Sequence, residues 1–128
     1  MNALEALADQ LREEDTPISP HVVDPQEPPH LGELAGGPEY ALVVEAVREG
    51  YLLHYGEPRL LAGHDPDLAL LAGDYLYALG LDRLAALGDD RAVAILADLI
   101  STCARLHAEG DTEGIPDLWR SAAAAIAA

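Results

Sequence analysis

Residues 65–88 read DPDLALLAGDYLYALGLDRLAALG. Asp65 followed by Pro66 is a favourable helix start, because the aspartate can accept hydrogen bonds from free backbone N–H groups and proline fits the first helical turn. Leucines recur at helical spacing through the segment, and Gly88 is a typical residue just beyond a helix end. The segment therefore predicts a long helix over residues 65–87 and an all-α fold.

The composition of the whole chain supports the same fold class. Half of the 128 residues are hydrophobic, but only 5% are aromatic and Phe is absent, so Leu and Ala supply most of the apolar mass. Both residues favour helices. Apolar periodicity predicts further helices over residues 3–14, 39–55, 89–107 and 117–127. We expect a helical bundle of about five helices.

A proline-rich segment separates the first expected helix from the others. Residues 16–38 contain Pro17, Pro20, Pro25, Pro28, Pro29 and Pro38. This density of proline disfavours regular helix and predicts an extended connector. We expect two parts: residues 1–38, an amphipathic helix with a proline-rich arm, and residues 39–128, a helical domain. The first helix would dock on this domain or on another copy.

The charge of the chain excludes some classes of function. The formal net charge is −16, from 23 acidic and 7 basic residues. Such a surface repels the phosphates of nucleic acids and anionic lipid headgroups, and instead favours solubility or a basic partner. We expect no binding to nucleic acid.

The cysteine content and hydropathy pattern indicate a compartment. Cys103 is the only cysteine, so no internal disulfide can form, and its apolar neighbours on the expected helix predict a small buried side chain. Residues 1–15 carry acids instead of a basic leader, and no apolar run approaches the ~18 residues of a membrane span. We expect a cytoplasmic protein without a transmembrane segment.

Four short motifs in residues 39–128 resemble the trans-polyprenyl diphosphate synthase (polyprenyl synthetase) family. Their order and approximate spacing agree with that family. They are Leu52-Leu53-His54, Leu71-Ala72-Gly73-Asp74-Tyr75-Leu76, Ala108-Glu109-Gly110 and Arg120-Ser121-Ala122-Ala123. The resemblance implies a truncated isoprenoid-synthase-like bundle, shorter than that of the family's enzymes.

The departures from the family concern its catalytic groups. In that family two Asp-rich motifs hold magnesium ions against the diphosphate leaving group. Here Tyr55-Gly56 follows His54 where the family has Asp-Asp, the usual arginine pair before Gly56-Glu57-Pro58 is missing, and the second Asp-rich motif would lie beyond the last residue. Departure of an allylic diphosphate needs positioned cations. The resemblance thus implies no catalytic residue, no metal site, no cofactor and no prenyl transfer by this chain alone.

Four residues remain candidates for ligand binding or a polar network. His54, Asp74 and His107 fall on apolar faces of expected helices, and Arg120 stands where the family has a lysine that helps to hold diphosphate. A buried carboxylate needs a hydrogen-bond donor or an opposite charge, so the first three residues could form a structural network or bind a transition metal.

Two further features of the sequence, a stripe of small residues and a loop, each allow two interpretations. Gly73 and Gly80, with Ala69, form a stripe of small residues that would admit another backbone or simply belong to the core. The loop at residues 63–67 contains His64, Asp65 and Asp67, which could touch a divalent ion, although capping of the next helix by Asp65 explains most of its composition.

Three functions follow from these features. The first is a non-catalytic accessory or interaction subunit that pairs helices with itself, as a dimer, or with a complete prenyl synthase in isoprenoid or quinone side-chain biosynthesis. The second is a module that binds an isoprenoid or a quinone in an apolar groove between helices. The third is a metal-dependent enzyme of another type that uses His54, Asp74 or His107.

Overall fold

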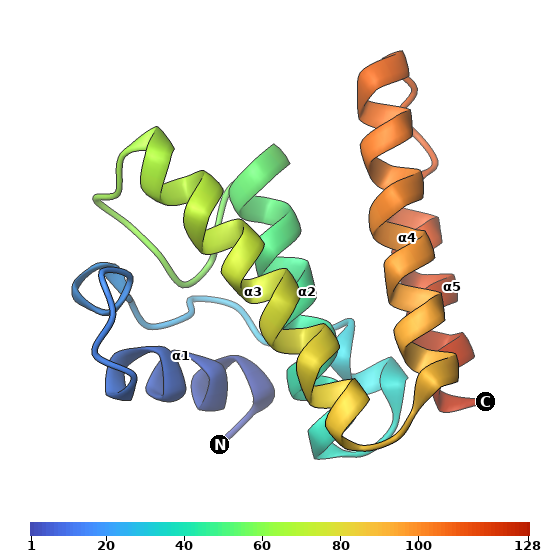
Figure 1. Cartoon of the computed structure of the whole chain (residues 1–128), viewed down its shortest axis with the longest axis horizontal. Coiled ribbons are helices and arrows are strands. Elements are labelled where there is room, and N and C mark those ends of the chain that lie inside the picture. Colours follow the sequence, from blue (N-terminus) through green and yellow to red (C-terminus); the bar gives the residue numbers. More distant parts are fainter.

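The computed structural model describes residues 1–128 and consists of helices joined by loops and short turns (Figure 1). The five α-helices confirm the expected all-α bundle. Their bounds are α1 (Ala3–Glu13), α2 (Pro38–Tyr55), α3 (Pro66–Ala86), α4 (Asp90–Glu109) and α5 (Ile115–Ala127). Two short 3-10 helices, η1 (Ser19–His21) and η2 (Gly32–Ala35), lie between α1 and α2.

The helix ends follow the capping signals in the sequence. The side chain of Asp65 accepts a hydrogen bond from the Leu68 N–H at 2.8 Å, and Asp89 accepts one from the Ala92 N–H at 3.0 Å. Gly110 ends α4 in the left-handed conformation (φ 73°), which glycine adopts without steric cost. The capping of α3 accounts for Asp65 in the loop at residues 63–67.

The proline-rich connector differs from the expected extended segment. It contains η1 and η2. Proline is tolerated in the first turn of a helix, as Pro20 is in η1, and η2 contains no proline. The connector also pairs with the loop before α3. Val23 N–H donates to the Leu60 carbonyl at 2.7 Å, and Ala62 N–H donates to the His21 carbonyl at 3.0 Å.

The first helix is seated on the rest of the chain. Leu4, Leu7 and Leu11 of α1 are fully buried in a hydrophobic cluster that also includes Leu53 of α2 and Leu76 of α3. The sequence allowed α1 to dock on the helical domain of its own chain or on another copy, and the structure has the first arrangement. The division of the chain at residue 38 into two parts stays a prediction.

Glycines bring the antiparallel helices α2 and α3 close together (Figure 1). A Cβ atom added at Gly50 would lie 2.8 Å from the Gly73 carbonyl oxygen, and one at Gly73 would overlap the His54 ring. A methyl group at Gly80 would overlap Val47. The stripe of small residues on α3 therefore faces α2 of the same chain, inside the core.

A second pair of helices, α4 and α5, completes the bundle (Figure 1). The larger hydrophobic cluster lies where this pair meets α2, with Val47, Tyr51, Leu96 and Trp119 among its buried members. From the short turn at residues 87–89, α3 and α4 run apart, so the first turns of α3 lie away from α4 (Figure 1).

Candidate functional site

The C-terminal end of α2 carries a group of aromatic and imidazole rings, which we call the histidine–tyrosine cluster. It comprises Tyr51, His54 and Tyr55 of α2, Tyr77 of α3 and His107 of α4. The Tyr51 hydroxyl lies 2.7 Å from His107 Nε2, and the Tyr55 ring stacks on the His107 ring with centroids 4.0 Å apart and planes 5° apart. The cluster joins three helices at one end of the bundle.

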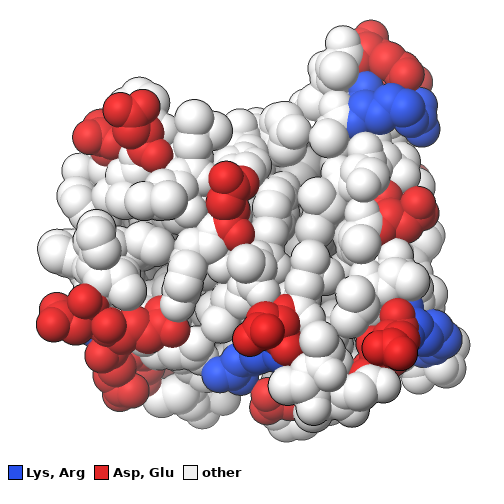
Figure 2. Space-filling view, viewed as in Figure 1, with Lys and Arg blue, Asp and Glu red and all other residues white.

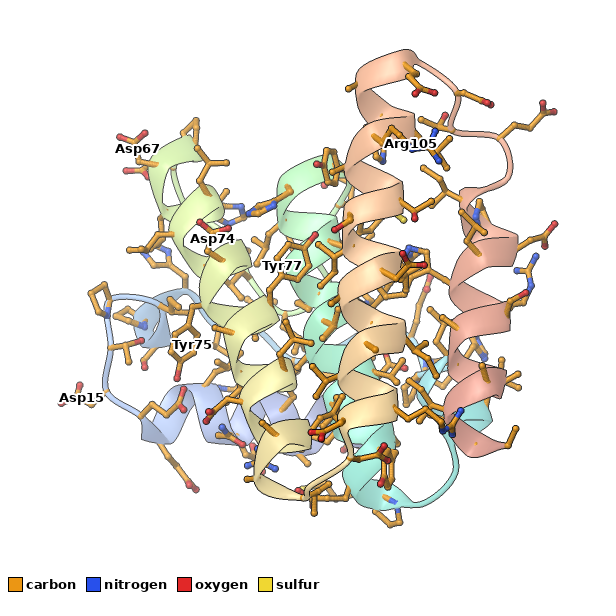
Figure 3. All side chains as sticks on the ribbon, turned by 45° about the vertical axis from the view of Figure 1, so that its right-hand side comes forward. Asp15, Asp67, Asp74, Tyr75, Tyr77 and Arg105 are labelled. Atoms are coloured by element: carbon orange, nitrogen blue, oxygen red, sulfur yellow. The ribbon has the colours of Figure 1, made fainter.

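His54 occupies the side of the cluster that faces α3. Its Nε2 lies 3.2 Å from the Leu70 carbonyl oxygen and 3.4 Å from Asp74 Oδ1. Its ring meets Tyr77 edge-on, at 5.2 Å between centroids. Figure 3 shows Asp74 and Tyr77 on the same helix, with Tyr77 extending toward the other helices.

Asp74 is not the buried carboxylate that the apolar face of its helix predicted. Its side chain is 75% exposed. The reason is the packing of α3: the glycine side of this helix contacts α2, and the turns around Asp74 diverge from α4, so no element covers that side. The Asp74 carboxylate therefore stays hydrated, and its pairing with His54 is a surface contact.

The four predicted site residues do not meet in one place. His54 and Asp74 are neighbours, and His107 is joined to them only through the rings of Tyr55 and Tyr51. Arg120 lies in the second turn of α5, is exposed and pairs with Asp117 one turn before it. No three His, Cys, Asp or Glu side chains lie close enough to hold a metal ion together.

Burial shifts the pKa of three groups in or beside the cluster. It raises the pKa of the Tyr77 and Tyr51 hydroxyls, with nearby Tyr55 and Cys103 adding to the shift. Burial also raises the pKa of the Cys103 thiol. These groups are therefore protonated at neutral pH, and Cys103 is the small buried side chain expected from the sequence.

A buried ionic network, which the sequence analysis did not identify, lies on the other side of α2. Glu45 and Glu49 are fully buried. Arg59 binds both: its Nη1 lies 2.7 Å from Glu45 Oε1 and its Nε lies 2.9 Å from Glu49 Oε1. Glu45 Oε2 accepts from the Gly32 N–H, and Glu49 Oε2 accepts from the backbone N–H groups of Arg59 and Leu60.

This network fixes two loops onto α2, namely η2 and the segment after Gly56. Its signal in the sequence is a pair of glutamates four residues apart, with Glu45 inside the apolar run Val43 to Val47 and Glu49 just after that run. That spacing places both carboxylates on one face of the helix. Acids in an apolar run indicate burial with a cationic partner, and Arg59 is the arginine that reaches them.

Comparison with known proteins supports the resemblance in part. No established family profile matches the chain, and no solved structure matches it. The chain is similar to heptaprenyl diphosphate synthase component 2 of Geobacillus stearothermophilus, with 36% identity over 80 residues. The match covers 62% of this chain and 24% of that protein, so the chain spans about a quarter of the length of the relative it matches.

This similarity fits the link to polyprenyl synthases that the four motifs indicated. The four motifs lie on α2 to α5 of the all-α fold described above. No helix of the chain combines the length and apolar character that crossing a membrane requires.

Proposed function

We propose that this chain is a non-catalytic accessory subunit, which packs its helices against a complete prenyl diphosphate synthase in isoprenoid or quinone side-chain biosynthesis. Its similarity to a protein named as one component of a heptaprenyl diphosphate synthase supports this proposal. The remaining support comes from the end of α2 and from the exposed side of α3.

The observation that carries the proposal is the position of Tyr55. It is the last residue of α2 and stands where the resembling family has the first magnesium-binding aspartate. Its ring stacks on His107 of α4, so this position serves helix packing. Neither Tyr55 nor Gly56 after it supplies a carboxylate that could bind a magnesium ion at this position.

Exposed apolar side chains at the C-terminal end of α2 and in the first turns of α3 suit a protein partner. Leu70 and Leu71 at the start of α3 are 59% and 60% exposed, and Tyr55 is 42% exposed. We call these three residues the Tyr55–Leu71 surface. Much of the area between α3 and α4 on the face in Figure 2 is free of charged groups, and most acidic side chains lie around it. Exposed apolar areas of this kind favour protein association.

The experiment is to mix the purified chain with the complete prenyl diphosphate synthases of its own organism and to measure complex formation and product length. The double variant Leu70→Ser/Leu71→Ser removes apolar contacts from the Tyr55–Leu71 surface. Leu87→Ser is the matched control, because Leu87 lies at the other end of α3 and is 49% exposed.

We expect a complex with the wild-type chain and with Leu87→Ser, and its loss with the double variant. The chain alone should produce no prenyl product with magnesium. Prenyl elongation by the isolated chain, or the absence of any complex or change in product length, contradicts the proposal.

One observation favours a second function, the binding of an isoprenoid or quinone. A pocket of about 570 Å³ lies between the first turn of α1, the segment around η2 and the first turn of α2. Its apolar lining includes Ala6, Pro38, Ala41 and Leu42. A melting temperature that rises with farnesol concentration in the wild type, but not in Ala41→Glu, would support this function, and equal behaviour of the two proteins would exclude this pocket.

A further inference from the structure

Arg48 differs from every other arginine of the chain. The seven basic residues are all arginines. Arg12, Arg59, Arg83, Arg105 and Arg120 pair with carboxylates, and Arg91 donates to carbonyl oxygens at the end of α5. Arg48 has no carboxylate within ion-pair distance and no hydrogen bond to the protein, although 23 acids are present.

Two aromatic rings hold the Arg48 guanidinium in place. Its Cζ lies 5.1 Å from the centroid of Tyr51 and 5.0 Å from that of Trp119, which are cation–π distances. The side chain is partly buried, and burial lowers the pKa of Arg48, with the charge of Arg59 as the second cause. Arg48 still remains charged at neutral pH, because the ordinary arginine pKa is far higher.

The nearest acid does not supply the missing partner. Glu45 acts on Arg48 through space, but its two carboxylate oxygens are bound to Arg59 and to the Gly32 N–H, each at 2.7 Å. The N–H donors of Arg48 therefore lack an acceptor within the protein. The Arg48 nitrogens are not among the buried atoms that lack a partner, so water reaches them, and an anion at this position would replace that water with charge-assisted hydrogen bonds.

Arg48 lines a pocket of about 160 Å³, which we call the Arg48 pocket. Leu31, Leu34 and Trp119 contribute apolar walls, Arg120 is the second cation, and His30 is also part of the lining. No carboxylate lines the pocket, in a chain of net charge −16. At about 30 Å³ per water molecule, the volume corresponds to about five waters, the size of a small organic molecule.

We propose that the Arg48 pocket binds the carboxylate of a small organic acid with an apolar body, and that Arg48 is the residue that pairs with this carboxylate. The inference is independent of the accessory role, because it concerns a different surface. The carboxylate takes the free donors of Arg48, and the apolar body lies against Leu31, Leu34 and Trp119.

Charge balance favours a carboxylate over a phosphate. Arg120 is already paired with Asp117, so the pocket offers about one uncompensated positive charge, that of Arg48. A single carboxylate matches it. Inorganic phosphate or diphosphate would bring excess negative charge to a protein that is already strongly acidic, and would leave the apolar walls without a partner.

Trp119 provides a direct readout, because it is the only tryptophan and lines the pocket. The probes are hexanoate, hexan-1-ol as the uncharged molecule of equal chain length, inorganic phosphate and diphosphate. Each is titrated at constant ionic strength and followed by tryptophan fluorescence and by calorimetry. Calorimetry is needed because substitution of Arg48 by itself changes the surroundings of Trp119.

We expect saturable binding of hexanoate, weakened about tenfold or more by Arg48→Gln, which corresponds to at least 1.4 kcal/mol. Arg105→Gln is the matched control, since Arg105 is exposed and pairs with Glu109, and it should leave the affinity unchanged. Leu34→Glu, at an exposed position on the pocket, should also abolish binding and keeps the test valid if Arg48→Gln fails to fold.

Binding of hexanol as tight as that of hexanoate would overturn the role of Arg48. Tighter binding of phosphate or diphosphate than of hexanoate would overturn the assigned ligand class. An affinity for hexanoate that survives both Arg48→Gln and Leu34→Glu, or no detectable binding to the wild type, would overturn the site.

Discussion

The hydroxyl of Tyr51 lies 2.7 Å from Nε2 of His107 and thereby connects the C-terminal turns of α2 and α4, which are 56 residues apart in sequence. Tyr55, one turn after Tyr51, stacks on the same imidazole. These contacts secure an end of the bundle at which α3 and α4 diverge. His107 is therefore a packing residue between helices in this structure.

We expect Tyr51→Phe to lower the free energy of unfolding by about 1 kcal/mol, because the change removes a partly buried hydrogen bond and keeps the ring. Urea denaturation at neutral pH measures the effect. Tyr77→Phe is the control, since the Tyr77 hydroxyl makes no hydrogen bond within the protein, and it should cause little change. Equal effects of the two variants would contradict the structural role of the Tyr51–His107 bond.

The close packing of α2 on α3 predicts a penalty at Gly73. Gly73→Ala places a methyl group against the His54 ring and near the Gly50 carbonyl, so it should destabilise the fold by about 1–3 kcal/mol, the usual cost of overpacking. Gly114→Ala is the matched control, because nothing lies within 4 Å of a Cβ at that position. Thermal unfolding of both variants tests the difference, and a neutral Gly73→Ala would show that the helices are not this close.

The buried network around Arg59 should be the most sensitive ionic contact in the chain. Arg59→Met leaves the carboxylates of Glu45 and Glu49 buried without their cation, and we expect a loss of about 3–5 kcal/mol. Arg105→Met removes an exposed pair with Glu109, which should cost less than about 1 kcal/mol. A similar, small effect of both changes would mean that the glutamates are hydrated.

The raised pKa of Tyr75 predicts that the free energy of unfolding falls at alkaline pH. Burial, followed by the hydrogen bond that its hydroxyl donates to Glu14 at 2.7 Å, raises the pKa of Tyr75 from 10.0 to about 12. Because the unfolded chain loses this proton first, the stabilisation is complete below pH 10 and is lost as the pH rises through about 12.

The corresponding measurement is the free energy of unfolding as a function of pH in wild type and Tyr75→Phe. The variant should lose less stability above pH 10 than the wild type, because one of several tyrosines with a raised pKa is gone. If Tyr75→Phe follows the wild-type profile, the hydroxyl of Tyr75 does not link α1 to α3.

The helices could be predicted closely because their signals are local. Asp65-Pro66, Asp89 and Gly110 act on backbone groups within one turn, and the predicted bounds of α3 and α4 agree with the structure to within a few residues. The connector was less predictable. Proline excludes a long α-helix there but allows the 3-10 turns η1 and η2, and its pairing with residues 60–62 depends on contacts distant in sequence.

The candidate site was predictable only in part. His54 does lie near Asp74, and His107 does lie near the end of α2, but a helical wheel placed Asp74 on a buried face. Burial of a face requires a neighbouring element, and none covers the outer side of α3. The same limit applies to Glu45 and Glu49, whose burial depends on the loop that brings in Arg59.

By itself, the amino-acid sequence determined the all-α class, the positions of the helix ends and the presence of Tyr55-Gly56 where the resembling family has aspartates. These properties depend on residue identity and on backbone groups within a few residues. The tertiary structure decided which polar side chains are buried, paired or left free: Glu45 and Glu49 are enclosed, Asp74 faces solvent, and Arg48 lines a pocket without a carboxylate. The physical reason is that desolvation and ion pairing depend on distances between segments remote in sequence, which only the packed helices set.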